Sequence, residues 1–179
     1  MPAKEIKELR VSGKLDEAYT LAKKELDEAM SRLVSPDEGS DLPSSVHSNL
    51  LWAKRNISWV FHEFLKVNCS PEKFDAFLKS LNAIKDLQLP PEETMLFDSL
   101  AWQVGKMCFA LLKEQTCDIN RILKLLEPVK LFHFTKPSEG YSFLFKAFHK
   151  AFKDSDHYLQ FVEWWDLNNF RPEDSSAWK

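Results

Sequence analysis

The sequence predicts an all-α protein, and three observations lead to this fold class. Leucine outnumbers valine, isoleucine and threonine combined, which favours helices over strands. Apolar residues recur every three or four positions through most of the chain, which is the period of one helix face. Prolines, glycines and serines interrupt this pattern only in short stretches. We therefore expect about eight helices and no strand.

Breaks in the apolar pattern give the boundaries of the first three helices. A short amphipathic helix over 3–11 ends at Ser12-Gly13, and a helix of about 20 residues begins at Lys14. Residues 34–46 combine prolines, a glycine and several serines, so we expect a flexible loop there. The third helix covers about 46–68.

Prolines and acidic residues indicate where the later helices begin. Ser70-Pro71-Glu72 is typical of a helix start, with a capping serine, a proline in the first turn and an acid near the positive end of the helix dipole. Pro90-Pro91 ends that fourth helix. The sequence predicts the remaining four starts at Glu92-Glu93, Asp118, Pro137 and Ser155.

The expected helices form four antiparallel pairs joined by short loops. The first helices of the second, third and fourth pairs begin near 47, 92 and 139, an interval of about 46 residues that is typical of helical-repeat arrays. A right-handed, solenoid-like stack of pairs and a compact helical array both satisfy this pattern. We expect one helical domain over 1–170 and a polar tail over 171–179.

Residues 12–26, SGKLDEAYTLAKKEL, carry a recognisable motif. Gly13 permits a tight turn, Glu17-Ala18 follow it, and the small Ala22 lets two helices approach closely. The segment resembles the turn and second helix of a tetratricopeptide repeat (TPR). The resemblance covers one repeat, and the interval between later pairs is longer than the TPR length of about 34 residues. It implies a TPR-like scaffold for protein–protein contacts, usually through a concave face.

Composition and charge exclude several classes of protein. The net charge of -3 and the pI near 6.0 give no global basic field for nucleic acid. The four glycines are scattered, so a phosphate-binding loop is missing. We find neither a run of about 18 apolar residues that would span a membrane nor the apolar core of a secretory signal in MPAKEIKELR. Three widely spaced cysteines, Cys69, Cys108 and Cys117, indicate a reducing, cytoplasmic location.

The candidate partner-binding side chains lie on the third and fifth helices, at spacings that place each group on one helix face. Aromatic rings beside cationic and amide groups suit the binding of a peptide or a partner helix. The alternative is that these two helices are buried on two sides and need a wide apolar band. The candidates are Trp52, Arg55, Asn56 and Trp59 on the third helix, and Trp102, Lys106 and Phe109 on the fifth.

Residues 118–153 suggest an alternative, nucleic-acid-associated function. This region contains seven basic and three acidic residues, and aromatic rings interleave with the charges. Its candidate contacts are Lys146, His149, Lys150 and Lys153. In combination with 12–26, residues 52–66, WAKRNISWVFHEFLK, are also similar to the N-terminal helical domains of larger bacterial or phage conflict-system proteins. The competing interpretation is a solvated basic helix face opposite a phenylalanine stripe.

The sequence offers no assembled reaction centre. None of the histidines has a cysteine or histidine three or four positions further on, so we expect no metal and no other cofactor. The acid pairs Glu92-Glu93 and Asp16-Glu17 stand in first helical turns, where the helix dipole favours carboxylates. We therefore expect a non-enzymatic interaction module. The aromatic residues of the eighth helix either fold back on the seventh helix or contact a partner, such as a second copy in a homodimer.

Overall fold

The computed structural model describes residues 2–34, 44–114 and 118–129, together with His149 and Lys153. Every regular element in these ranges is helical, which confirms the all-α prediction. The helices that the sequence places after Pro137 and Ser155, and the polar tail 171–179, lie outside the described residues. The elements are α1 (Pro2–Val11), α2 (Leu15–Val34), α3 (Ser44–Val67), the 3₁₀ turn η1 (Pro71–Lys73), α4 (Phe74–Asp86), α5 (Thr94–Leu112) and α6 (Ile119–Val129).

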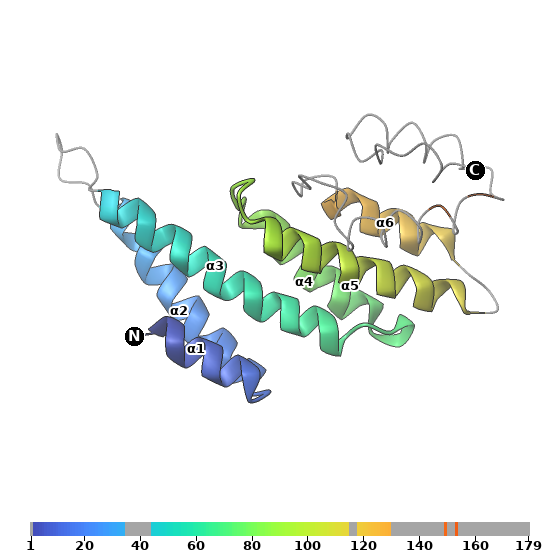
Figure 1. The fold of residues 1–179 in the computed structure, drawn as a ribbon, viewed down its shortest axis with the longest axis horizontal. Helices are drawn as coiled ribbons and strands as arrows, with labels where there is room; N and C mark the ends of the chain where they lie inside the picture. Colours follow the sequence, from blue (N-terminus) through green and yellow to red (C-terminus); the bar gives the residue numbers. More distant parts are fainter. Residues whose placement is uncertain (1, 35–43, 115–117, 130–148, 150–152, 154–179) are drawn as a thin grey trace.

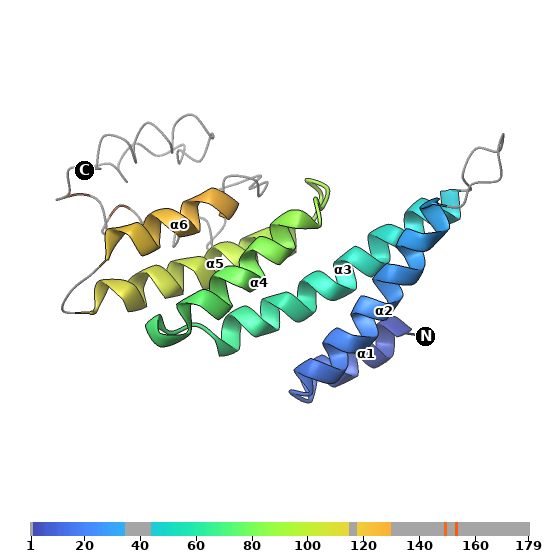
Figure 2. The ribbon, with the colours of Figure 1, turned by 180° about the vertical axis from the view of Figure 1, so that it is seen from behind.

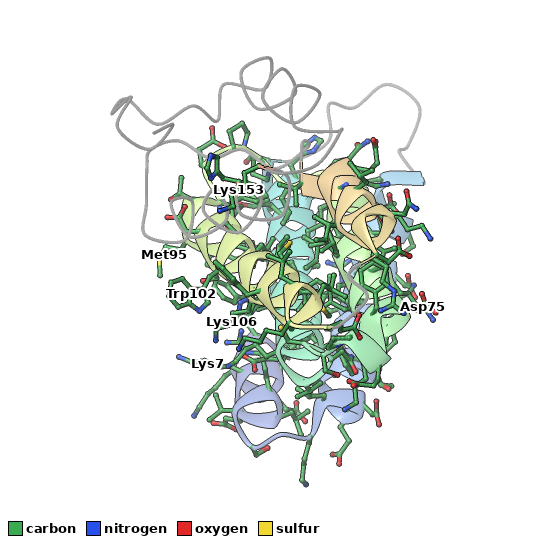
Figure 3. All side chains as sticks on the ribbon, turned by 90° about the vertical axis from the view of Figure 1, so that its right-hand side faces the viewer. Lys7, Asp75, Met95, Trp102, Lys106 and Lys153 are labelled. Carbon is green, nitrogen blue, oxygen red and sulfur yellow. The ribbon has the colours of Figure 1, made fainter. Side chains whose placement is uncertain are left out.

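The helices are arranged on two sides of α3, which runs through the middle of the described structure (Figure 1). Viewed along the long axis, α1 and α5 lie on one side and α2, α4 and α6 lie on the other (Figure 3). The reverse view shows α2 and α4 in front, with α3 passing between them (Figure 2). We call the α1, α3 and α5 side the odd face and the α2, α4 and α6 side the even face.

Neighbouring helix pairs stack in two different ways. The first pair, α1 and α2, packs on α3 chiefly through α2, which lies antiparallel to α3. The third pair instead places α5 on α3 and α6 on α4. The first helices of the second and third pairs therefore contact each other, and so do their second helices. A regular superhelix would repeat one stacking step. Within the described residues, the first pair therefore packs on the second pair differently from the way the third pair does, and the array is irregular.

Two apolar clusters hold these helices together, and both draw on α3. The smaller joins α1, α2 and α3 around Ile6, Ala22 and Ile57. The larger joins the end of α3 to α4, α5 and α6 around Phe77 and Leu100. Phe61 of α3 packs against both clusters, so α3 connects the apolar core at one end of the described structure to the core at the other end.

The turn between α1 and α2 agrees with the sequence prediction. Gly13 has a φ of +80°, in the left-handed region that glycine adopts readily. Its N–H donates to the Arg10 carbonyl at 3.2 Å, and the Lys14 N–H donates to the Leu9 carbonyl at 2.9 Å. These two bonds form a Schellman motif, which ends α1 and reverses the chain within a few residues.

Three predicted boundaries are wrong in detail. Ser70 precedes the η1 turn rather than an α-helix, and its side chain makes no capping hydrogen bond. Helix α5 starts at Thr94, so Glu93 occupies its N-cap position instead of its first turn. Both ends of the expected loop over 34–46 are helical, because α2 includes Val34 and α3 begins at Ser44. Serine is tolerated in the first turn of a helix, where the unsatisfied backbone N–H groups lie.

Helix α5 is long and apolar enough to cross a membrane by length and composition, in contrast to the expectation that the chain contains no such segment. In the fold, 56% of that segment is buried against the protein. A core helix meets the same test of length and hydropathy, so packing against α3 and α6 accounts for its apolar character.

Candidate functional site

Arg55 connects α3 to the start of α5. Its Nε donates to the Glu93 Oε1 in a part-buried ion pair, and the two side chains are 29% and 13% exposed. Glu93 is available for this contact because α5 begins only at Thr94. The sequence placed Arg55 in a partner groove and gave Glu93 only a helix-dipole role. The structure brings both residues into one contact between helices.

Trp52 is the most accessible aromatic ring of the candidate set. It is 55% exposed, and the Arg55 guanidinium lies 5.0 Å from its ring centroid. Cation–π contact and the ion pair to Glu93 act on the same guanidinium, which restricts the positions open to the ring. A large exposed ring held in place loses little conformational entropy when a partner covers it.

Asn56 points in a different direction from Arg55. Its Nδ2 donates to the Glu25 Oε2 of α2 at 2.8 Å. This part-buried bond ties the antiparallel α2–α3 hairpin together, so the amide is used inside the fold. The i, i+3, i+4 spacing placed Trp52, Arg55 and Asn56 on one face, but that face is wide enough to contact α5 on one side and α2 on the other.

Trp59 is half-buried at the crossing of α1 and α3. The Arg10 guanidinium of α1 lies 5.4 Å from its ring centroid, and its ring meets His62 edge-on at 5.3 Å between centroids. Trp59 also packs against the larger apolar cluster. Trp59 therefore contributes to the packing of the larger apolar cluster and also contacts a cationic side chain on the odd face.

His62 is a buried polar residue that the sequence did not single out. It is 7% exposed, and neither ring nitrogen makes a hydrogen bond among the described residues, although the Ser99 backbone of α5 faces the ring. Burial lowers the pKa of His62 to about 4. Glu63 opposes this shift, while Lys66 and Arg10 add to it. His62 is thus neutral near pH 7.

The α5 candidates lie farther along the odd face. Lys106 Nζ is 5.7 Å from the centroid of the Trp102 ring, and both side chains project from the same side of the molecule (Figure 3). An open depression of about 520 Å³ is lined by Lys106, Phe109, Ala110 and Lys113, which lie on one face of α5. Trp102 and Phe109 have further interactions in the fold.

The alternative basic region can be followed only in part. Of its four candidate contacts, His149 is half-buried and Lys153 is exposed, and the Lys153 N–H donates to the His149 carbonyl at 2.9 Å. Lys146 and Lys150 lie outside the described residues. On α6, Arg121 packs its guanidinium 5.5 Å from the Phe74 ring centroid and pairs with Glu114 at 3.6 Å, so one of the region's charges is used within the fold.

Metal-binding and thiol chemistry find little support in the described ranges. Within them, no three His, Cys, Asp or Glu side chains come together in a group that could hold a metal ion. Cys108 is fully buried in the larger apolar cluster, as its position on the core stripe predicts. Burial raises the pKa of the half-buried Cys69 thiol, which lowers the fraction present as reactive thiolate.

No protein-family model, no curated protein and no solved structure matches this chain. Its function must therefore be argued from its own residues. The sequence pattern did not reveal the roles of Glu25, Glu93 and His62. Each acts through a contact with another helix, which helical periodicity within one segment does not reveal.

Proposed function

We propose that this protein is a non-enzymatic interaction module that binds a peptide or a partner helix across its odd face. The observation that carries this proposal is the exposed Trp52 ring, stacked by Arg55 and fixed through Glu93. Tryptophan and arginine are the residues most enriched at binding hot spots. Trp59, Trp102, Lys106 and Phe109 extend the surface along α3 and α5.

The geometry also favours particular roles within the candidate set. Trp52 supplies accessible apolar area, and Lys106 supplies an exposed cation beside Trp102. Arg55 acts mainly by holding Trp52, and Asn56 acts by holding α2. We further propose that the helix pairs continue the TPR-like pattern into a fourth pair and that the protein works in the cytoplasm.

The test compares proteins that co-purify from the native source with the parent chain and with two variants. Trp52→Ala removes the exposed ring and should abolish the specific partner while leaving Tm within a few degrees, because surface truncations change stability little. Val67→Ala is the matched control, since Val67 is also 55% exposed but lies at the far end of α3. Equal recovery with both variants would refute the proposal.

A nucleic-acid partner is the other outcome of this experiment. Titration of the parent chain with a labelled duplex at about 50 and 200 mM salt distinguishes the two functions, because phosphate contacts lose affinity steeply as salt rises. Saturable, strongly salt-dependent binding that depends on Lys153 would support the basic region instead of the odd face.

A further inference from the structure

The even face carries a groove between α2 and α4 that the odd-face proposal does not use. It has a volume of about 410 Å³. Helices α2 and α4 flank α3 here without extensive contact with each other, which follows from the irregular first step of the array. The groove is lined by Asp16 and Tyr19 of α2, Phe61 and Phe64 of α3, Asn68 just after α3, and Ala76, Lys79, Ser80 and Ala83 of α4.

The floor of the groove is aromatic and preorganised. Tyr19 lies 5.8 Å from Phe61 and 6.4 Å from Phe64 between ring centroids, in tilted and edge-on arrangements that aromatic rings favour. The wall on α4 is formed by small residues at i, i+4 and i+7: Ala76, Ser80 and Ala83. Small side chains let another backbone approach α4 closely.

Ser80 gives this wall a polar group. The residue is 9% exposed and lines the groove. A serine inside a helix usually bonds its own backbone or faces solvent. A hydroxyl that lines a groove is a position where an occupant gains a hydrogen bond.

The two rims of the groove carry opposite charges. Asp16 on α2 and Lys79 on α4 are both exposed, and neither forms an ion pair among the described residues. An elongated occupant with an apolar stripe, a base on one flank and an acid on the other would complement both rims. An amphipathic helix has this pattern, since residues three and four apart share a face.

We propose that the even-face groove binds an amphipathic helix of a partner protein, with its apolar stripe on Tyr19, Phe61 and Phe64. A basic residue of that helix pairs with Asp16, and an acidic residue on its other flank pairs with Lys79. The Ser80 hydroxyl bonds a polar side chain or a carbonyl group of the approaching helix. This site uses none of the odd-face residues.

The probe is a designed helical peptide of about 18 residues, long enough to fold when alanine and Glu–Lys pairs fill the positions outside the stripe. It carries leucines at i, i+4 and i+7, an arginine on one flank and a glutamate on the other. Fluorescence anisotropy of the labelled peptide against the full chain should give saturable binding. A peptide with serines in place of the leucines should not bind.

Ala83→Glu places a carboxylate on the half-buried wall of the groove and should weaken binding by about 10-fold or more. Ala110→Glu is the matched control, because Ala110 is also half-buried but lies on α5. If Ala83→Glu lowers Tm strongly, Ala76→Arg at an exposed position serves as the blocking variant. Peptide binding that is equal in the blocking and control variants would overturn the proposal.

A charge exchange tests the orientation of the helix. Asp16→Arg should weaken the parent peptide and should restore binding to a second peptide in which the arginine is replaced by glutamate. The same loss for both peptides would contradict the assigned contact, as would no saturable binding by either. Trp52→Ala, which tests the odd face, should leave peptide affinity unchanged, so the two proposals can fail independently.

Discussion

Arg55 of α3 and Glu93 at the N-cap position of α5 form a part-buried ion pair between residues 38 positions apart in the chain. The pair joins the middle of α3 to the residue that precedes α5. It also fixes the guanidinium that stacks on Trp52. One contact therefore links the packing of two helices to the geometry of the most exposed tryptophan.

A double-mutant cycle should measure this link. Arg55→Ala, Glu93→Ala and the double variant should give a coupling free energy of about 1 to 2 kcal/mol in denaturant unfolding, because the partners are largely shielded from solvent. The exposed Lys24–Glu28 pair on α2 is the control and should couple by less than about 0.5 kcal/mol. Similar coupling in both pairs would mean that solvent screens Arg55 and Glu93 fully.

Buried His62 should make stability depend on pH. Its pKa is about 4 in the folded chain and 6.5 as a model value, so the unfolded chain takes up the proton first as pH falls. The contribution of His62 to the free energy of unfolding should therefore be constant above about pH 7 and decrease by about 3 kcal/mol between pH 6.5 and 4.

The matched variants for this pH effect are His62→Phe and His47→Phe, since His47 is exposed on the same helix. Urea unfolding across pH 4 to 7 should show a flatter profile for His62→Phe than for the parent chain. The profile of His47→Phe should stay close to that of the parent. A parent profile already flat over this range would show that His62 keeps a hydrogen-bond partner when protonated.

Two left-handed backbone positions should respond in opposite directions to substitution. Gly13 has φ +80° with open space around its Cα, so Gly13→Ala should destabilise the chain by about 1 kcal/mol through backbone strain alone. Gln88, after α4, has φ +50° without being glycine. Gln88→Gly should stabilise the chain by about 0.5 to 1 kcal/mol. Thermal unfolding measures both, and a shift of the same sign in the two variants would contradict the assigned strain.

The close approach of α2 to its neighbours depends on small residues. Ala18 and Ala22 are fully buried in the smaller apolar cluster. Ala22→Leu should lower the free energy of unfolding by about 1 to 3 kcal/mol through overpacking. Ala3→Leu, at a half-buried position of α1, should lower it much less. Equal Tm values for the two variants would indicate that α2 can move away from α3 without loss.

The sequence predicts most accurately those features that depend on residues within a single helix or turn. The Asp118 carboxylate accepts a hydrogen bond from the Asn120 N–H at 3.0 Å, as its predicted capping role requires. Gly13 ends α1, and Ala22 is buried, because both requirements are local to one turn or one stripe. The start of α5 was misplaced because an acid is favourable both at the N-cap and in the first turn.

The candidate site shows why periodicity was insufficient. Spacing placed Trp52, Arg55, Asn56 and Trp59 on one face of α3, but their contacts reach α1, α2 and the residue before α5. His62 and Leu65 are buried because α3 is covered on several sides. A helix at the centre of an array has no single apolar stripe, so its sequence cannot show which of its faces remain exposed.

The sequence alone determined that the chain is helical and where most of its described helices begin and end, because leucine spacing, glycine and proline act within a few residues. Only the tertiary structure decided that α2 packs on α3 while α6 packs on α4, that Arg55 meets Glu93, and that a groove opens between α2 and α4. Those outcomes depend on how side chains from distant segments fill space together, and packing of that kind is not encoded in any single stretch of the chain.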